Sequence, residues 1–179
     1  VIVNTCGFID DAKKEAIENI LDMVELKKEG VIGKIIVTGC LAQRYKEEIV
    51  KEIPEVDAVV GIGANGDIIK TVEEVMDSIS TVEKYPPRCD LPLEGQRILT
   101  TPQYWAYLKI GEGCSNRCTY CTIPSIRGNM RSRSMENVIE EAKQLAELGV
   151  KELILIAQDT TSYGLDLYGE YKLAALVRR

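Results

Sequence analysis

Short apolar runs alternate with amphipathic stretches along the first 83 residues of the chain. The apolar runs, which predict strands, lie at 1–5, 34–38 and 58–62, and the stretches with helical spacing lie at 10–29, 44–53 and 67–80. In the first of these helices Ala16, Ile17, Ile20, Leu21 and Val24 recur at helical spacing, and Gly30 provides a stop. Three successive strand-helix units predict an α/β domain with a parallel sheet over residues 1–83.

A second alternation begins after a proline-rich stretch. Residues 84–104 have no periodicity and contain four of the six prolines, so we interpret them as a linker. Beyond it we expect a strand at 105–110, a loop at 111–133, a helix at 135–148 between Ser134 as cap and Gly149 as stop, and a strand at 152–157. Residues 153–157 are continuously apolar, which predicts a parallel strand covered on both faces. Residues 105–179 therefore predict the first part of a β/α barrel.

The amino-acid composition excludes several classes of catalytic and metal-binding site. The 179 residues include no histidine, which excludes Ser/His/Asp triads, Cys/His dyads and zinc sites that need imidazole. Six cysteines without a secretory leader favour metal ligation or redox chemistry over disulfides. No apolar run approaches the roughly 20 residues of a membrane-spanning helix. We expect a cytoplasmic protein without a membrane partner.

Charge is divided unevenly along the chain. The net charge is −6, but residues 1–83 hold 9 basic and 17 acidic side chains, a balance of −8, whereas residues 84–179 hold 13 and 11, a balance of +2. An acidic lobe is a poor surface for phosphate backbones. We therefore expect no direct nucleic-acid binding by this chain, and a basic protein partner suits the first lobe better.

Three cysteines, which we call the cysteine triad, follow the strand predicted at 105–110, where the carboxyl ends of parallel strands gather catalytic groups. Cys114, Cys118 and Cys121 can supply three thiolates to a 4Fe-4S cluster and leave its fourth iron open to a substrate. A structural zinc knuckle is the alternative, and it needs Cys89 or Cys40 as a fourth ligand. In that case the chain is a zinc-stabilised binding module and not an enzyme.

The spacing Cys-x3-Cys-x2-Cys, with Tyr120 before the last cysteine, resembles the signature of the radical S-adenosylmethionine (SAM) enzymes. The resemblance implies that the cysteine triad is catalytic, that the open iron binds the methionyl end of SAM, and that Tyr120 lies against adenine. It also implies that Gln158 and Asp159, which leave the strand predicted at 152–157, belong to a segment that contacts the methionyl amine. An external electron donor reduces the cluster in such enzymes.

Four longer segments resemble the methylthiotransferases and extend the resemblance over nearly the whole chain. They are NTCGFI (4–9), VTGCLAQR (37–44), GCSNRCTYCTIPSIRGNMRSR (113–133) and AQDTTSYGLDLYG (157–169). The family implies a second 4Fe-4S cluster, with Cys6 and Cys40 as two ligands and a third ligand before Val1. Both cysteines follow predicted strands, so a parallel sheet places them on one edge. Taken singly, each also suits a small core residue, and Cys89 matches no family ligand.

The last of these segments resembles the branch that methylthiolates the β-carbon of an aspartate in a small-subunit ribosomal protein. A tRNA adenosine methylthiotransferase is the alternative within the family. The resemblance implies that a SAM-derived radical removes the substrate hydrogen, and that sulfur and methyl arrive from the second cluster and a second SAM. The sequence begins without methionine and stops within a helical pattern. We therefore expect a fragment, truncated at both ends, that is inactive by itself.

Two further patterns stay open to more than one interpretation. Arg127, Arg131 and Arg133 form a basic run that suits a carboxylate or a phosphate, and equally a solvated loop. The segment GIGANG at 61–66 superficially satisfies a dinucleotide fingerprint. No strand with a ribose-binding acid follows it before the linker, so we interpret it as turn glycines with Asp67 as a helix cap.

Overall fold

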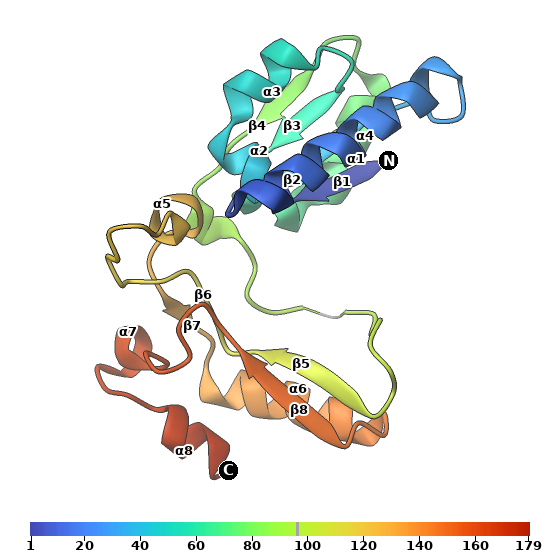
Figure 1. Ribbon diagram of the computed structural model, residues 1–179. Helices are drawn as coiled ribbons and strands as arrows, with labels where there is room; N and C mark the ends of the chain where they lie inside the picture. Colours follow the sequence, from blue (N-terminus) through green and yellow to red (C-terminus); the bar gives the residue numbers. More distant parts are fainter. Residues whose placement is uncertain (96) are drawn as a thin grey trace. The chain divides into compact units, whose positions relative to one another are not determined.

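The computed structural model describes residues 1–95 and 97–179 (Figure 1). Gln96, which belongs to the predicted linker, lies outside the described residues. The described residues form two compact units, Val1–Pro92 and Leu93–Arg179, and each has an apolar core of its own. None of the helices in these residues is long and apolar enough to cross a membrane.

The first unit is built on a parallel sheet with the strand order β1-β2-β3-β4. Its strands are β1 (Ile2–Thr5), β2 (Ile36–Gly39), β3 (Ala58–Val60) and β4 (Val82–Lys84). The parallel sheet predicted from the three strand-helix units is confirmed. Strand β4 was not predicted, because three residues, of which only Val82 is buried, are too few to show a period.

Helices cover both faces of this sheet. They are α1 (Asp10–Lys28), α2 (Cys40–Arg44), α3 (Lys46–Glu52) and α4 (Ile68–Asp77), with 3-10 turns η1 (Ile62–Asp67) and η2 (Arg88–Asp90). Ile20 of α1 belongs to the same apolar cluster as Val37, whereas Val75 of α4 belongs to the cluster of Ile36. Because neighbouring strand residues point to opposite faces, α1 and α4 lie on opposite sides of the sheet (Figure 1).

Two local predictions in this unit were wrong. The single helix predicted at 44–53 begins at Cys40 and is interrupted at Tyr45, whose backbone is not helical (φ −123°, ψ 37°). Asp67 occupies the N-cap position of α4, but its carboxylate pairs with Lys70 at 2.7 Å and caps no backbone N–H.

The GIGANG segment forms η1, where a Cβ on Gly63 would lie 2.3 Å from the carbonyl oxygen of Pro87, so glycine is needed there for close packing.

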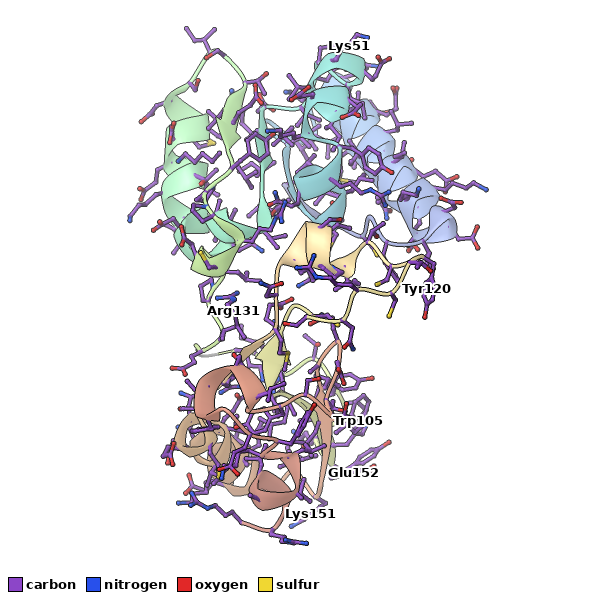
Figure 2. All side chains as sticks on the ribbon, turned by 90° about the vertical axis from the view of Figure 1, so that its left-hand side faces the viewer. Lys51, Trp105, Tyr120, Arg131, Lys151 and Glu152 are labelled. Atoms are coloured by element: carbon purple, nitrogen blue, oxygen red, sulfur yellow. The ribbon has the colours of Figure 1, made fainter. Side chains whose placement is uncertain are left out.

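The second unit starts as a β/α arrangement. Its strands are β5 (Trp105–Lys109), β6 (Gly111–Glu112), β7 (Arg131–Ser132) and β8 (Glu152–Ile156), and its helices are α5 (Ile123–Arg127), α6 (Met135–Glu147), α7 (Leu165–Tyr168) and α8 (Leu173–Val177). Strands β5 and β8 pair in parallel, with Trp105 opposite Glu152 (Figure 2). Helix α6 connects them, and Ser134 caps it by accepting a hydrogen bond from the backbone N–H of Asn137, as predicted.

The expectation that both faces of strand β8 are covered was wrong. Leu153 and Leu155 pack into the core that α6 shares with β5. Ile154 and Ile156 on the other face are each 37% exposed. Within the described residues, a single layer of helices covers this pair of strands, so burial alternates along β8 although its sequence does not.

Candidate functional site

Cys6 and Cys40 lie at one edge of the first unit's sheet. Thr5 ends β1 and is paired in register with Gly39, which ends β2, so the two cysteines follow directly at equivalent positions. A Cβ on Gly7 would lie 2.9 Å from the carbonyl carbon of Cys40, so the two segments are in backbone contact. The structure thus brings together the two cysteines that the sequence predicted at one edge.

The surroundings of these cysteines differ. Cys6 is exposed, and Cys40 is buried at the start of α2. The hydroxyl of Thr5 donates to the carbonyl oxygen of Thr38 at 2.5 Å, which adds a side-chain bond between β1 and β2. Cys89 belongs to the same unit, is exposed in η2 and takes part in no disulfide.

The cysteine triad lies on a loop of the second unit that is closed at its base. Strands β6 and β7 pair in antiparallel fashion, with Glu112 opposite Arg131, and they enclose residues 113–130. Within the loop, the N–H of Cys114 donates to the carbonyl oxygen of Gly128 at 3.1 Å, and that of Cys121 donates to Cys118 at 3.1 Å. Cys114 is buried, Cys121 is half-buried and Cys118 is exposed, and none of the three forms a disulfide.

Gly113 allows the loop to turn directly after β6. Its φ of +74° lies in the left-handed region that favours glycine. A Cβ at this position would also lie 2.3 Å from the carbonyl oxygen of Asn129, so any side chain would push the two ends of the loop apart. The glycine before Cys114 in the predicted motif therefore has a steric cause.

Glu112 is the feature that the sequence analysis missed. Its side chain is 0% exposed, and Oε1 accepts hydrogen bonds from Nη1 of Arg127 at 2.8 Å and from the N–H of Gly113 at 3.1 Å. Its other carboxylate oxygen pairs with the ammonium of Lys109. Burial by itself raises the pKa of Glu112, but the bonds from Lys109 and Arg127 outweigh it and hold the pKa below its ordinary value.

The basic run predicted at Arg127, Arg131 and Arg133 divides by role. Arg127 is paired with Glu112, and Arg133 is 5% exposed, where it pairs with Glu141 at 2.5 Å and donates to the carbonyl oxygen of Lys109 at 2.7 Å. Both guanidinium groups therefore bind carboxylates of the chain itself and hold the fold, so neither arginine belongs to a solvated loop. Arg131 lies in β7 at the base of the loop (Figure 2).

Asp159, a predicted SAM-binding residue, connects the loop after β8 to the triad loop. Its carboxylate accepts hydrogen bonds from the hydroxyls of Ser162 and Thr161, both at 2.6 Å, and from Nδ2 of Asn116 at 2.9 Å. These bonds, that from Ser162 first, lower the pKa of Asp159 to about 2. The carboxylate is therefore ionised at neutral pH. Gln158 beside it is exposed.

Tyr120 lies on the surface of the triad loop (Figure 2). Its side chain is 86% exposed, so the ring is available to stack against a ligand.

A second network, which the sequence also did not predict, connects segment 157–169 to β7 and to Arg133, the residue that follows β7. Asp166 accepts hydrogen bonds from the backbone N–H of Ser132 at 2.8 Å and from its hydroxyl at 2.6 Å. The hydroxyl of Tyr163, which is fully buried, donates to the carbonyl oxygen of Arg133 at 2.9 Å. No spacing in the sequence indicates these pairs, since their members are 30 or more residues apart.

The donor set of the second unit fits an iron-sulfur cluster. A 4Fe-4S cluster with one open iron needs three thiolates from the protein, one for each of the other three irons. Three thiols on one closed loop, none in a disulfide, match that requirement. Cys6 and Cys40 fit as two of three ligands.

Two known family models match this chain, one within each of its two units. Residues 1–61 match the uncharacterized protein family UPF0004, and residues 108–178 match the radical SAM superfamily. The first match contains Cys6 and Cys40, and the second contains the cysteine triad.

Curated relatives match almost the whole chain. The ribosomal protein uS12 methylthiotransferases RimO of Clostridioides difficile, Thermoanaerobacter sp. and Caldanaerobacter subterraneus are 55%, 52% and 56% identical to it over 99% of its length. The chain spans about 40% of the length of each of these relatives.

Proposed function

We propose that this chain, which belongs to the RimO-type radical SAM methylthiotransferases, supplies the radical-generating loop and part of the sulfur-insertion site of such an enzyme. The observation that carries the proposal is the identity of more than half of all residues to the relative from C. difficile, over a length that includes all five candidate cluster ligands. The closed triad loop after β5 supports it independently.

The cofactors that we propose are SAM and two 4Fe-4S clusters. The cysteine triad would hold the first cluster, which supplies an electron to SAM when both are bound. Cys6 and Cys40 would contribute two ligands to the second, at the sheet edge where their segments touch. We also propose an external electron donor, which would reduce the first cluster.

Each remaining candidate residue has a task that its surroundings allow. The exposed ring of Tyr120 offers a face for adenine. The ionised carboxylate of Asp159 can accept a further hydrogen bond from an ammonium group, and Gln158 lies exposed beside it. The hydrogen bond from Asn116 fixes this carboxylate relative to the triad loop.

The substrate that we propose is an aspartate of ribosomal protein uS12, the protein on which the relatives are named to act. The overall change replaces one hydrogen of the β-carbon by a methylthio group. The balance of −8 over residues 1–83 suits a basic ribosomal protein and opposes contact with RNA phosphates. We also propose a cytoplasmic location, because six cysteines outside disulfides suit a reducing compartment.

A substrate assay tests this proposal. The intact protein that contains this chain is reconstituted anaerobically with iron and sulfide and incubated with SAM, a reductant, and either uS12 or tRNA. Mass spectrometry should find a methylthio group on one uS12 aspartate and none on tRNA. Modification of tRNA adenosine with unmodified uS12 would instead support the tRNA-modifying branch.

A further inference from the structure

Glu112 is fully buried and lies next to the cysteine triad in the sequence. It precedes Cys114 by two residues, and its carboxylate is 0% exposed. A buried carboxylate is costly unless charged or polar partners replace the water that it loses, and a well-packed apolar residue is often as stable at such a place. A purely structural account of the core therefore does not require a charge here.

The partners of Glu112 come from the two ends of the triad loop. Lys109 is the last residue of β5, before the loop, and Arg127 is the last residue of α5, after Cys121. The ion pair between Glu112 and Arg127 therefore closes a ring of chain that contains the whole cysteine triad. We call Lys109, Glu112 and Arg127 the charged clasp.

Backbone bonds close the loop at the same level. The N–H of Gly113 donates to the Glu112 carboxylate, the N–H of Cys114 donates to Gly128, and the N–H of Met130 donates to the hydroxyl of Ser115 at 3.1 Å. None of these contacts uses a cysteine thiol. The loop is thus held shut by groups other than the thiols.

We propose that Glu112 is a positioning residue, and that the charged clasp closes the triad loop in the metal-free chain so that its three thiols are presented together before a cluster binds. Thiols on a preformed loop lose less conformational entropy when iron arrives. The inference rests on the proposed function only for the identity of the bound group. Closure of the metal-free loop is a separate property that can be measured separately.

Hydrogen exchange of the metal-free 179-residue chain tests this closure. We compare E112Q, which removes the charge but keeps the shape, with R127M, R127K and the double variant E112Q/R127M. The matched control is R117M, because Arg117 is an exposed arginine of the same loop outside the clasp. Exchange is followed in peptides from 113–130, from α6 and from the first unit, and iron per chain is measured after reconstitution.

We expect E112Q and R127M each to speed exchange in 113–130 by about tenfold, the effect of losing one hydrogen bond to a charged group. The double variant should add little to either single variant, since both break the same pair. R127K should restore part of the protection, and R117M should leave it unchanged. Exchange in α6 should stay as in the unsubstituted chain, and iron per chain should fall in E112Q, R127M and the double variant but not in R117M.

Two results would overturn the inference. One is exchange in 113–130 that is equal in E112Q, R127M and R117M. The other is an equal rise in exchange over all of residues 93–179, which would make the clasp a general support of the fold. If the loop responds as expected but no variant, nor the unsubstituted chain, takes up iron, the proposed function fails and the clasp stands.

Discussion

Nδ2 of Asn116 donates a hydrogen bond of 2.9 Å to Oδ2 of Asp159, a residue 43 positions further along the chain. Asn116 lies between the first two cysteines of the triad, and Asp159 lies just after β8. The bond therefore joins the loop that would hold the cluster to the segment that would bind the methionyl amine. It gives the second unit one continuous candidate site.

Replacing Asn116 by Ala should separate these two parts without unfolding them. The bonds from Thr161 and Ser162 remain, so Asp159 stays ionised. Because the lost bond is exposed, the free energy of unfolding should fall by no more than about 1 kcal/mol. Hydrogen exchange in residues 157–163 should rise several-fold, and N129A, at an exposed asparagine of the same loop, should show no such rise. Equal exchange in both variants would contradict the link.

Tyr163→Phe tests a second contact of segment 157–169, the hydrogen bond from Tyr163 to Arg133, which follows β7. Tyr163 is 0% exposed, and burial raises the pKa of its hydroxyl to about 12, so the group acts as a hydrogen-bond donor. Removing the hydroxyl leaves the carbonyl of Arg133 without that donor and should cost about 1 to 2 kcal/mol in urea unfolding followed by the fluorescence of Trp105. Tyr171→Phe is the control, since Tyr171 is 68% exposed and should change stability by less than about 0.5 kcal/mol.

Asp57 should make the first unit sensitive to acid. Its carboxylate binds Lys27 at 2.5 Å, Lys34 at 3.1 Å and the N–H of Ile35 at 2.9 Å. Burial raises the pKa of Asp57, but the bonds from Lys27, Ile35 and Lys34 outweigh it, so its pKa lies below the ordinary value. The stability that this carboxylate contributes is complete above the ordinary pKa and is lost as the pH falls through the lowered one.

The comparison of Asp57→Asn with the unsubstituted chain isolates this contribution. At pH 7 the variant should be less stable by about 2 kcal/mol, the scale of hydrogen bonds to charged groups. The difference should shrink as the pH is lowered below about 4, because the carboxylate of the unfolded chain then binds a proton, and it should vanish once the pH has passed the lowered pKa of the native carboxylate. Hydrogen exchange of β2 and β3 measures it, with D22N at an exposed position of α1 as control. A difference that stays constant down to pH 2 would contradict the assignment.

The sequence predicted the elements whose pattern repeats over many residues. Helix α6 and its Ser134 cap, the parallel order of the first sheet and the shared edge of Cys6 and Cys40 all follow from periodicity and topology. Strand β4 is too short to carry a period. Whether one or both faces of β8 are covered depends on which layers pack against the strand. The apolar sequence of the strand itself does not contain this information.

The parts of the candidate site that were missed are pairs of polar residues far apart in sequence. Glu112 and Arg127 are separated by 15 positions, and Ser132 and Asp166 by 34. Each of these charged or polar residues, taken alone, is of a type that is common on protein surfaces. Only the folded chain brings it to its partner. The role of the arginine run stayed open for the same reason, because the acids that neutralise Arg127 and Arg133 lie outside the run.

The central claim is that the cysteine triad binds an iron-sulfur cluster, and iron and acid-labile sulfide per chain test it most directly. The 179-residue chain is reconstituted anaerobically as the C6A/C40A variant, which removes the two thiols of the first unit. We predict about four iron and four sulfide per chain for the remaining triad, with a visible charge-transfer band. Further replacement of Cys114, Cys118 and Cys121 by Ala should reduce both to background, whereas C89A should not. About one zinc per chain with no iron, or iron that survives loss of the triad, would contradict the claim.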